Sequence, residues 1–351
     1  MPHRAPRHLR SRRVTRPRMS AGLGATPRPE STRLSSRYPG GSLGDDEHRV
    51  VATPSPPSGG ARRIVLTSKA DFTGAYNAAD PRDYYSSLGD LDYQIPTHGA
   101  PVFRRLADAL SEHGSAPTVL DVCCSYGINA ALLNHDITFD EIRDHYAHPR
   151  TAGLSSDELV AADRALFAQR RRSDALEVIG LDVSRAAVDY AVHAGLLDHG
   201  LVVDLEADHP AGDLDAVNEL LAQVDLVTVT GGVGYVQRRT FERIVAASLD
   251  EPPWIAALTL RWVDFDPIAR SLERYGLVTE RLDGYLVRQR RFADDEERAF
   301  VFESLDAHGV APTSIEHEGW HCAELFVARP DAAPLEPISS LLDAAGASAQ
   351  R

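Results

Sequence analysis

The chain of 351 residues carries 37 Lys and Arg against 51 Asp and Glu, so it is acidic overall. The charge is uneven: residues 1–63 hold 13 Arg and 4 acids, whereas residues 64–351 hold 24 basic and 47 acidic residues, a net charge of −23. This balance argues against DNA or RNA as the partner of residues 64–351, because phosphate contacts supply most of the affinity for nucleic acids.

The number of cysteines predicts the cellular compartment, and the length of the apolar runs argues against a membrane-spanning protein. Three cysteines are too few for a disulfide framework, and the neighbours Cys123 and Cys124 could be bridged only with severe strain. We therefore expect a reducing cytoplasm. No run of 18 apolar residues occurs, so no membrane span is expected.

Residues 1–62 are rich in Arg, Pro, Ser and Gly and poor in apolar residues, which predicts a disordered basic N-terminal tail. Arg12 and Arg13 resemble an export signal, but no apolar core follows them. The two methionines are Met1 and Met19, and a translation start at either fits the sequence.

Residues 63–113 predict an aromatic N-terminal segment followed by a helix. The segment is dense in aromatic residues, which are Phe72, Tyr76, Tyr84, Tyr85 and Tyr93. It could be an ordinary cover on the sheet or a lid that closes over a ligand. Apolar residues from Val102 to Leu110 recur at helical spacing and predict a helix that begins at Thr97.

Residues 118–133 predict a buried strand that ends at an acid and turns into a helix. The apolar residues around Asp121 are typical of a parallel strand covered on both faces. Ser125 to Gly127 would form the turn, and the helix that follows has no acid in its first turn. Such a strand end and helix start form a cradle of backbone N–H groups. Asp121 would repel a pyrophosphate there, so the cradle suits a cationic or amino-bearing ligand.

This stretch resembles the first motif of class I S-adenosylmethionine-dependent methyltransferases, an acid followed by x-G-x-G-x-G. Asp121 stands at the acid and Gly127 at the third glycine, while Cys123 and Ser125 replace the first two glycines. Neither replacement tolerates positive φ as glycine does, so the sequence does not determine the backbone path of this loop. The resemblance implies that these residues hold the methionine end of S-adenosylmethionine.

The next strand comes unusually late, and residues 134–174 contain two further helical patterns, 138–147 and 155–171. The second begins at Ser155, an N-cap type followed by acids. We interpret 134–174 as a helical insertion that either roofs the site and helps to choose the substrate or buttresses the fold.

A second apolar strand ends at Asp182, and Ser184 then caps a helix. An acid at this position accepts hydrogen bonds from ribose hydroxyls. A third strand, 200–204, ends at Asp204, and the resemblance implies that Asp204 and Leu205 lie beside the adenine. Asp121 and Asp182 together point to a nucleoside ligand with a positive or amino end more specifically than either alone.

Later elements complete the pattern. A fourth strand over 224–230 opens at Thr230 into a glycine-rich loop, which the resemblance places beside cofactor and substrate, and 253–261 predicts a fifth strand. Residues 264–292 read as an insertion with a helix and an added strand, whose arginines could bind an anion or form an exposed edge. A helix over 294–308 precedes two antiparallel strands, 314–317 and 321–328. Residues 331–351 read as a C-terminal tail.

The expected fold is a three-layer α/β/α Rossmann-like sandwich over residues 114–330, with a mostly parallel seven-stranded sheet and an antiparallel last strand. The sequence shows no metal-ligand constellation. It pairs no general base with a partner, so His98, Tyr235 and His321 are only weak catalytic candidates.

The resulting hypothesis is a methyltransferase that uses S-adenosylmethionine to methylate oxygen, nitrogen or carbon of a small molecule. One alternative is an NAD(P)-dependent Rossmann oxidoreductase, which would share the acid at Asp182. Another is a non-catalytic S-adenosylmethionine-binding regulatory protein, which the altered glycines at 123 and 125 would suit. The methyl acceptor and the oligomeric state are not predicted.

Overall fold

The structure is a computed structural model that describes residues 73–112, 114–248, 250–331 and 337–343. The described residues belong to one compact unit, Arg63–Arg351. The predicted tail 1–62 and Phe72 lie outside them. In the described part of the chain, no helix is both long and apolar enough to cross a membrane.

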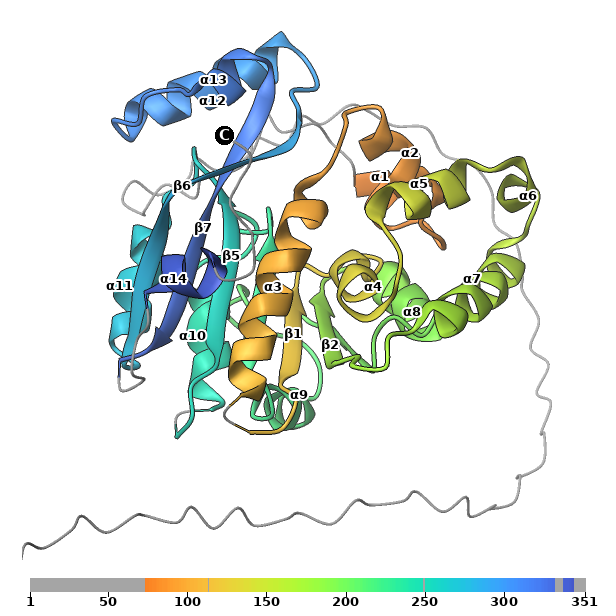
Figure 1. Cartoon of the computed structure of the whole chain (residues 1–351), viewed down its shortest axis with the longest axis horizontal. Helices are drawn as coiled ribbons and strands as arrows, with labels where there is room; N and C mark the ends of the chain where they lie inside the picture. Colours follow the sequence, from red (N-terminus) through yellow and green to blue (C-terminus); the bar gives the residue numbers. More distant parts are fainter. Residues whose placement is uncertain (1–72, 113, 249, 332–336, 344–351) are drawn as a thin grey trace, which may run out of the picture. The chain divides into compact units, whose positions relative to one another are not determined.

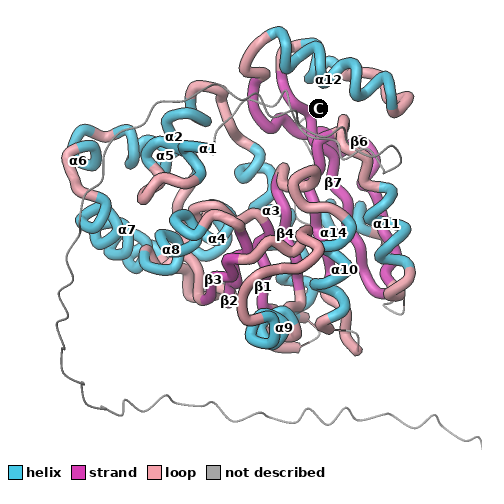
Figure 2. The backbone as a smooth tube through the Cα atoms, turned by 180° about the vertical axis from the view of Figure 1, so that it is seen from behind, coloured by secondary structure: helices cyan, strands magenta, loops and turns pink. Residues whose placement is uncertain are grey.

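Seven strands of the described chain form one sheet in the order β3-β2-β1-β4-β5-β7-β6 (Figures 1 and 2). They are β1 (Thr118–Val122), β2 (Glu177–Asp182), β3 (His199–Val202), β4 (Leu226–Thr230), β5 (Trp254–Leu260), β6 (Leu277–Arg291) and β7 (Trp320–Pro330). Strands β1 to β5 pair in parallel, and β7 runs antiparallel to both β5 and β6. The expected mostly parallel sheet with an antiparallel last strand is confirmed.

The central strands are apolar on both faces because helices cover both. Val119 of β1 faces one core, while Leu120 and Val122 face the other, and all three are at most 1% exposed. Alternation of side chains along a strand separates the two cores, which is why the sequence reads as a continuous apolar run.

Helices form the two outer layers (Figures 1 and 2). Those whose apolar residues join the core of Val119 include α3 (Ile95–Ser111), α4 (Ile128–Asn134), α8 (Arg185–His193), α12 (Asp295–Ala307) and α14 (Ile338–Asp343). On the opposite face lie α9 (Leu214–Leu221), α10 (Arg238–Ala246) and α11 (Asp266–Glu273). The remaining helices are α1 (Thr73–Tyr76), α2 (Arg82–Gly89), α5 (Phe139–Ala147), α6 (Pro149–Ala152), α7 (Ser156–Arg170) and α13 (Ser314–His317).

Three predicted elements in the C-terminal part of the chain differ from the structure. The strand predicted at 314–317 is wrong: this segment is α13, started by a reciprocal capping box between Thr313 and Glu316. The partner of β7 is instead β6, which is longer than the predicted strand at 285–292. Part of the predicted C-terminal tail is helix α14, whose Ile338 and Leu342 are buried, and Arg105 donates to the Leu341 carbonyl at 2.9 Å.

Candidate functional site

The candidate site lies where the loops after β1, β2 and β4 leave the sheet. β1 pairs with β2 on one side and with β4 on the other, so the strand order reverses at β1. Ligands of open α/β sheets bind at such a reversal, beyond the carboxyl ends of the strands. The residues predicted at Asp121, Asp182 and Thr230 occupy these three strand ends.

The loop after β1 follows a glycine-like path although it lacks two of the expected glycines. The backbone has φ of 58° at Cys123, 48° at Ser125 and 79° at Gly127. A left-handed conformation costs a residue with a Cβ about 1–2 kcal/mol. Only one other described non-glycine residue, Asp92, has positive φ, so this strain is concentrated at the candidate site.

We expect Cys123→Gly and Ser125→Gly each to stabilise the protein by about 1 kcal/mol, because glycine adopts positive φ without the Cβ penalty. Chemical denaturation measures the change. Gly127→Ala is the opposite control, since a Cβ there would lie 3.1 Å from the Cβ atoms of Ala191 and Leu196. Destabilisation by both glycine variants would show that the loop is not strained.

Asp121 is a buried acid with only half of its carboxylate paired. It is 0% exposed, and its Oδ1 accepts from Asn129 Nδ2 at 2.8 Å and from Thr228 Oγ1 at 3.0 Å. Burial raises the pKa of Asp121 to about 7, against the two hydrogen bonds that lower it, and the charge of Asp182 raises it further. The carboxyl is therefore poised to ionise when a cation approaches.

Buried oxygens of three residues at this loop have no hydrogen-bond partner among the described residues. They are Asp121 Oδ2, Ser125 Oγ and Asn129 Oδ1. An unpaired buried polar atom costs about 1–3 kcal/mol. A carboxylate and an amide carbonyl that both await donors fit an ammonium group, and they disfavour an anion.

Asp182 fastens the loop after β1 to the loop after β2. Its Oδ2 accepts from the Ser125 N–H and its Oδ1 from the Ser184 N–H, both at 2.9 Å. Each carboxylate oxygen has a second lone-pair site and can accept a further hydrogen bond. Ser184 is already in use, because its Oγ caps α8 at Ala187 and donates to the Tyr76 carbonyl at 2.7 Å.

The third predicted strand end is shifted. β3 ends at Val202, and Asp204 is an exposed turn residue whose Oδ1 accepts from the N–H groups of Glu206 and Ala207. Leu205 is 4% exposed and packs in the core of Leu120, so it is not free to cover a ring.

Val183 is a residue that the sequence reading missed. It directly follows Asp182 and is 67% exposed, more than any other large apolar side chain of the described residues. An apolar side chain exposed to water beside the strand-end acid Asp182 suits the face of a base. The signal available in the sequence was an apolar residue placed between a strand-end acid and an N-cap serine.

The N-terminal segment crosses over the loops after β1 and β2. Tyr126 donates its hydroxyl to the carbonyls of Ala75 at 2.7 Å and Ala78 at 2.9 Å. Tyr84 contacts Tyr126 edge to face, with ring centroids 5.6 Å apart. The segment predicted as a cover or lid is therefore attached directly to the candidate site.

The three weak catalytic candidates lie in different settings. His98 is half-buried on α3, and burial followed by the Arg288 charge lowers its pKa, which favours the neutral imidazole. Tyr235 follows β4 and is 56% exposed. His321 is fully buried on β7, where Trp262 Nε1 donates to its Nδ1 at 3.4 Å, a setting typical of a core histidine.

The arginines at 288–291 are held by protein groups. Arg290 is 1% exposed and pairs with both carboxylate oxygens of Glu297, at 2.6 and 2.8 Å. Arg288 and Arg291 lie over the ring of Trp320, 5.0 and 4.4 Å from its centroid. Arg290 is buried and fits neither expectation, whereas the partly exposed Arg288 and Arg291 suit the expected exposed edge better than an anion site.

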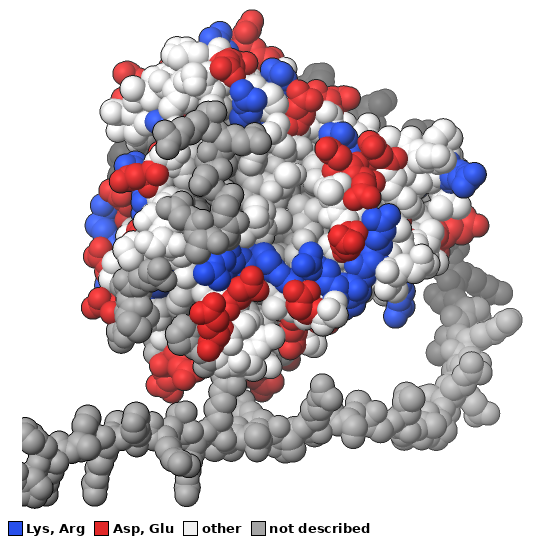
Figure 3. Space-filling view, viewed as in Figure 1, with Lys and Arg blue, Asp and Glu red and all other residues white. Residues whose placement is uncertain are grey.

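Basic side chains gather in a band on the face that carries α3 and α4 (Figure 3). Arg104 of α3 pairs with Asp174, and Arg170 of α7 pairs with Glu141 at 3.1 Å. Their charge is thus offset locally, unlike that of a continuous phosphate-binding track.

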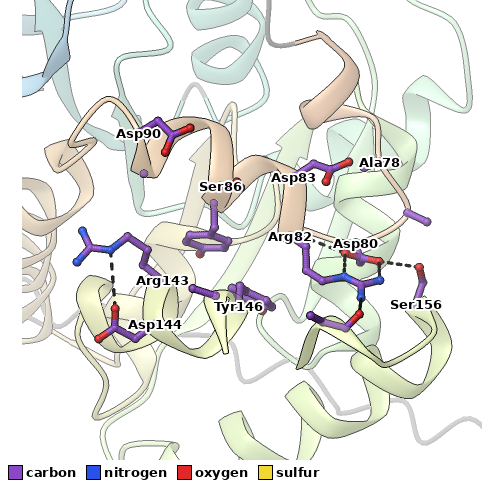
Figure 4. A pocket seen from close by; sticks show the side chains of 15 residues that line it. Ala78, Asp80, Arg82, Asp83, Ser86, Asp90, Arg143, Asp144, Tyr146 and Ser156 are labelled. Carbon is purple, nitrogen blue, oxygen red and sulfur yellow. Dashed lines mark hydrogen bonds and ion pairs between the residues drawn. The ribbon is translucent and has the colours of Figure 1, made fainter. Parts of the chain in front are cut away.

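A separate cavity of about 770 Å³ lies between α2 and the insertion helices α5 to α7 (Figure 4). Asp80 and Arg82 pair at one end of it at 2.7 Å, and Ser156 of α7 donates to Asp80 at 2.6 Å. None of the predicted cofactor residues lines this cavity. The insertion therefore packs against the N-terminal segment.

Among the described residues, no group of three His, Cys, Asp or Glu side chains could hold a metal ion. The described cysteines form no disulfide with one another.

Solved structures of S-adenosylmethionine-dependent methyltransferases align with the chain at low identity. A protein from Agrobacterium tumefaciens is 10% identical, with 65% of this chain covering 60% of that one, less than two thirds of its length, at a TM-score of 0.32. A TehB-like enzyme from Corynebacterium glutamicum is 16% identical over 64% of this chain and 86% of that one, at a TM-score of 0.31.

Magnesium protoporphyrin IX methyltransferase from Synechocystis PCC 6803, solved with bound S-adenosylmethionine, is 12% identical over 71% of this chain and 83% of that one, at a TM-score of 0.31. No family model matches the chain, and no curated protein does. TM-scores this low carry no argument about the fold. The fold is instead assigned from the strand order. The order β3-β2-β1-β4-β5-β7-β6 with an antiparallel β7 is the mostly parallel, Rossmann-like α/β fold that the resemblance to class I S-adenosylmethionine-dependent methyltransferases implies.

Proposed function

We propose that the protein is a methyltransferase that takes its methyl group from S-adenosylmethionine. The observation that carries the proposal is a pair of acceptors at the loop after β1, Asp121 Oδ2 and Asn129 Oδ1, which are buried and have no hydrogen-bond partner among the described residues. An oxidoreductase that binds NAD would have to bring a pyrophosphate against the Asp121 carboxylate, with a loss of affinity.

Each strand end has a part in this proposal. Asp121 and the loop after β1 hold the ammonium end of the methionine, and Asp182 accepts from the ribose hydroxyls. Val183 covers one face of the adenine, and the exposed Asp204, whose Oδ1 accepts from two backbone N–H groups, contacts its amino group through Oδ2. Thr230, which accepts from Asn129 at 3.1 Å, borders the methyl group.

The sulfonium group supplies an already activated methyl, so the protein must align an acceptor and exclude water. Residues 73–94 would exclude water as a lid, attached through Tyr126 and Ser184. Where the acceptor carries a proton, the neutral His98 could take it, since burial lowers its pKa.

We propose a small molecule as the acceptor rather than a nucleic acid. The net charge of −23 over residues 64–351 and the paired arginines of α3 and α7 support this choice. Tight, salt-sensitive binding of RNA in a filter assay would contradict it. We propose a reducing compartment such as the cytoplasm, because three cysteines are too few for a disulfide framework.

Protection of Cys123 from alkylation tests the proposed site. Cys123 is partly exposed in the loop after β1, while Cys124 and Cys322 are buried, and burial raises the pKa of both thiols. Iodoacetamide followed by mass spectrometry should therefore modify Cys123 first. Saturating S-adenosylhomocysteine should slow that reaction about tenfold or more, because bound ligand covers the loop. NAD should not slow it.

The two buried cysteines serve as internal controls, since a general stabilisation of the fold would protect them as well. Equal modification of Cys123 with and without S-adenosylhomocysteine would contradict the site assignment.

A further inference from the structure

Asn129 joins two strand ends of the proposed site. It lies in α4, and its side chain is 4% exposed. Its Nδ2 donates to Asp121 Oδ1 at 2.8 Å and to Thr230 Oγ1 at 3.1 Å, so it links the ends of β1 and β4. Its Oδ1 is buried without a partner among the described residues. A buried amide with satisfied donors and an unpaired acceptor is costly to fold unless a ligand completes it.

The orientation of this amide follows from its neighbours. An ionised carboxylate accepts hydrogen bonds and cannot donate them. With Asp121 ionised, as an ammonium ligand requires, exchange of Oδ1 and Nδ2 would place the Asn129 carbonyl against the carboxylate and set two acceptors against each other. Oδ1 is therefore the atom left for a ligand, and it belongs to the same cluster as the unpaired Asp121 Oδ2.

A second buried asparagine on the same helix shows what a purely structural role looks like. Asn134 is 0% exposed, its Nδ2 donates to the Leu176 carbonyl, and its Oδ1 accepts from the Leu176 N–H, both at 2.8 Å. Its amide is used on both sides by the protein. Asn129 differs in leaving its acceptor empty at the candidate site.

We propose that Asn129 is a positioning and specificity residue for the methyl donor, an inference that rests on the proposed function. Its Oδ1 accepts an N–H from the ammonium group beside Asp121, and its Nδ2 holds Asp121 and Thr230 in place. The site thereby selects an adenosine sulfur ligand that carries an amino group over one that lacks it.

Calorimetry on the full chain with two probes tests this inference. S-adenosylhomocysteine carries the amino-acid end, whereas 5′-methylthioadenosine shares its adenosine and sulfur but lacks that end. Asn129→Ala should lower the affinity for S-adenosylhomocysteine about tenfold or more, at least about 1.4 kcal/mol, since the variant loses a hydrogen bond to a charged group. Its affinity for 5′-methylthioadenosine should stay within about twofold.

Asn134→Ala is the matched control. It should lower the melting temperature but leave the ratio of the two affinities unchanged, because Leu176 is its partner. An Asn129→Ala variant that loses both probes equally, or neither, would overturn the inference and leave Asn129 a structural residue. A wild-type chain that binds neither probe would overturn the proposed function, and this inference with it.

Discussion

Asp182→Ala is expected to lower the affinity for S-adenosylhomocysteine about 100-fold or more, because the variant loses the acceptor of two ribose hydroxyls. The same carboxylate accepts from the N–H groups of Ser125 and Ser184 at 2.9 Å, so its loss also frees the loop after β1. Calorimetric titration of the full chain measures the change in affinity. Thermal unfolding measures how much of it comes from a looser fold.

Asp198→Ala provides a matched control at the other end of β2. Asp198 also accepts from a backbone N–H, that of Val178 at 2.9 Å, but near the first residues of the strand. Its removal should lower stability and leave ligand affinity unchanged. Similar losses of affinity in both variants would mean that Asp182 acts only through stability, and the ribose assignment would fail.

Asp121→Asn is expected to lose the ligand and, at high pH, to gain stability. Burial raises the pKa of Asp121 to about 7, compared with about 3.9 in an unfolded chain. Because the pKa of Asp121 is higher in the folded state, its protonated carboxyl favours folding at pH values below the unfolded-state pKa. This contribution to stability is lost as the pH rises through about 7. The wild type should therefore lose about 2–4 kcal/mol of stability between pH 4 and pH 8 that Asp121→Asn keeps.

Denaturation of both proteins at several pH values measures this difference. The pH dependence of the stability difference between the two proteins reports the charge of Asp121 alone. Any packing cost of the introduced amide does not change with pH and therefore cancels. In the wild type, affinity for S-adenosylhomocysteine should fall as pH drops below about 7, since an ammonium requires the ionised Asp121. A stability difference that is flat from pH 5 to pH 8 would show that Asp121 is ionised throughout.

The fold was largely predictable because its signals are local. The apolar strands that end at Asp121 and Asp182, and the capping serines at 155 and 184, predicted elements that the structure confirms. The strand predicted at 314–317 was wrong because a capping box between Thr313 and Glu316 begins helix α13 there. Strand β6 was predicted too short because its pairing with β7 is a tertiary property, interrupted by register shifts.

The site was predictable in composition but not in geometry. The sequence singled out Cys123 and Ser125 as misfits for a glycine loop, yet both adopt the positive φ of glycine. Their strain depends on the surrounding structure, including the hydrogen bond from Ser125 to Asp182. Asn129 and Val183 were missed because an unpaired amide and an exposed apolar side chain become visible only when their neighbours are placed.

The most direct test of the central claim is calorimetric titration of the full chain with S-adenosylhomocysteine and, separately, with NAD. The proposed function predicts micromolar binding of S-adenosylhomocysteine, about −8 kcal/mol, and no binding of NAD. Binding of NAD without S-adenosylhomocysteine would contradict it and favour an oxidoreductase.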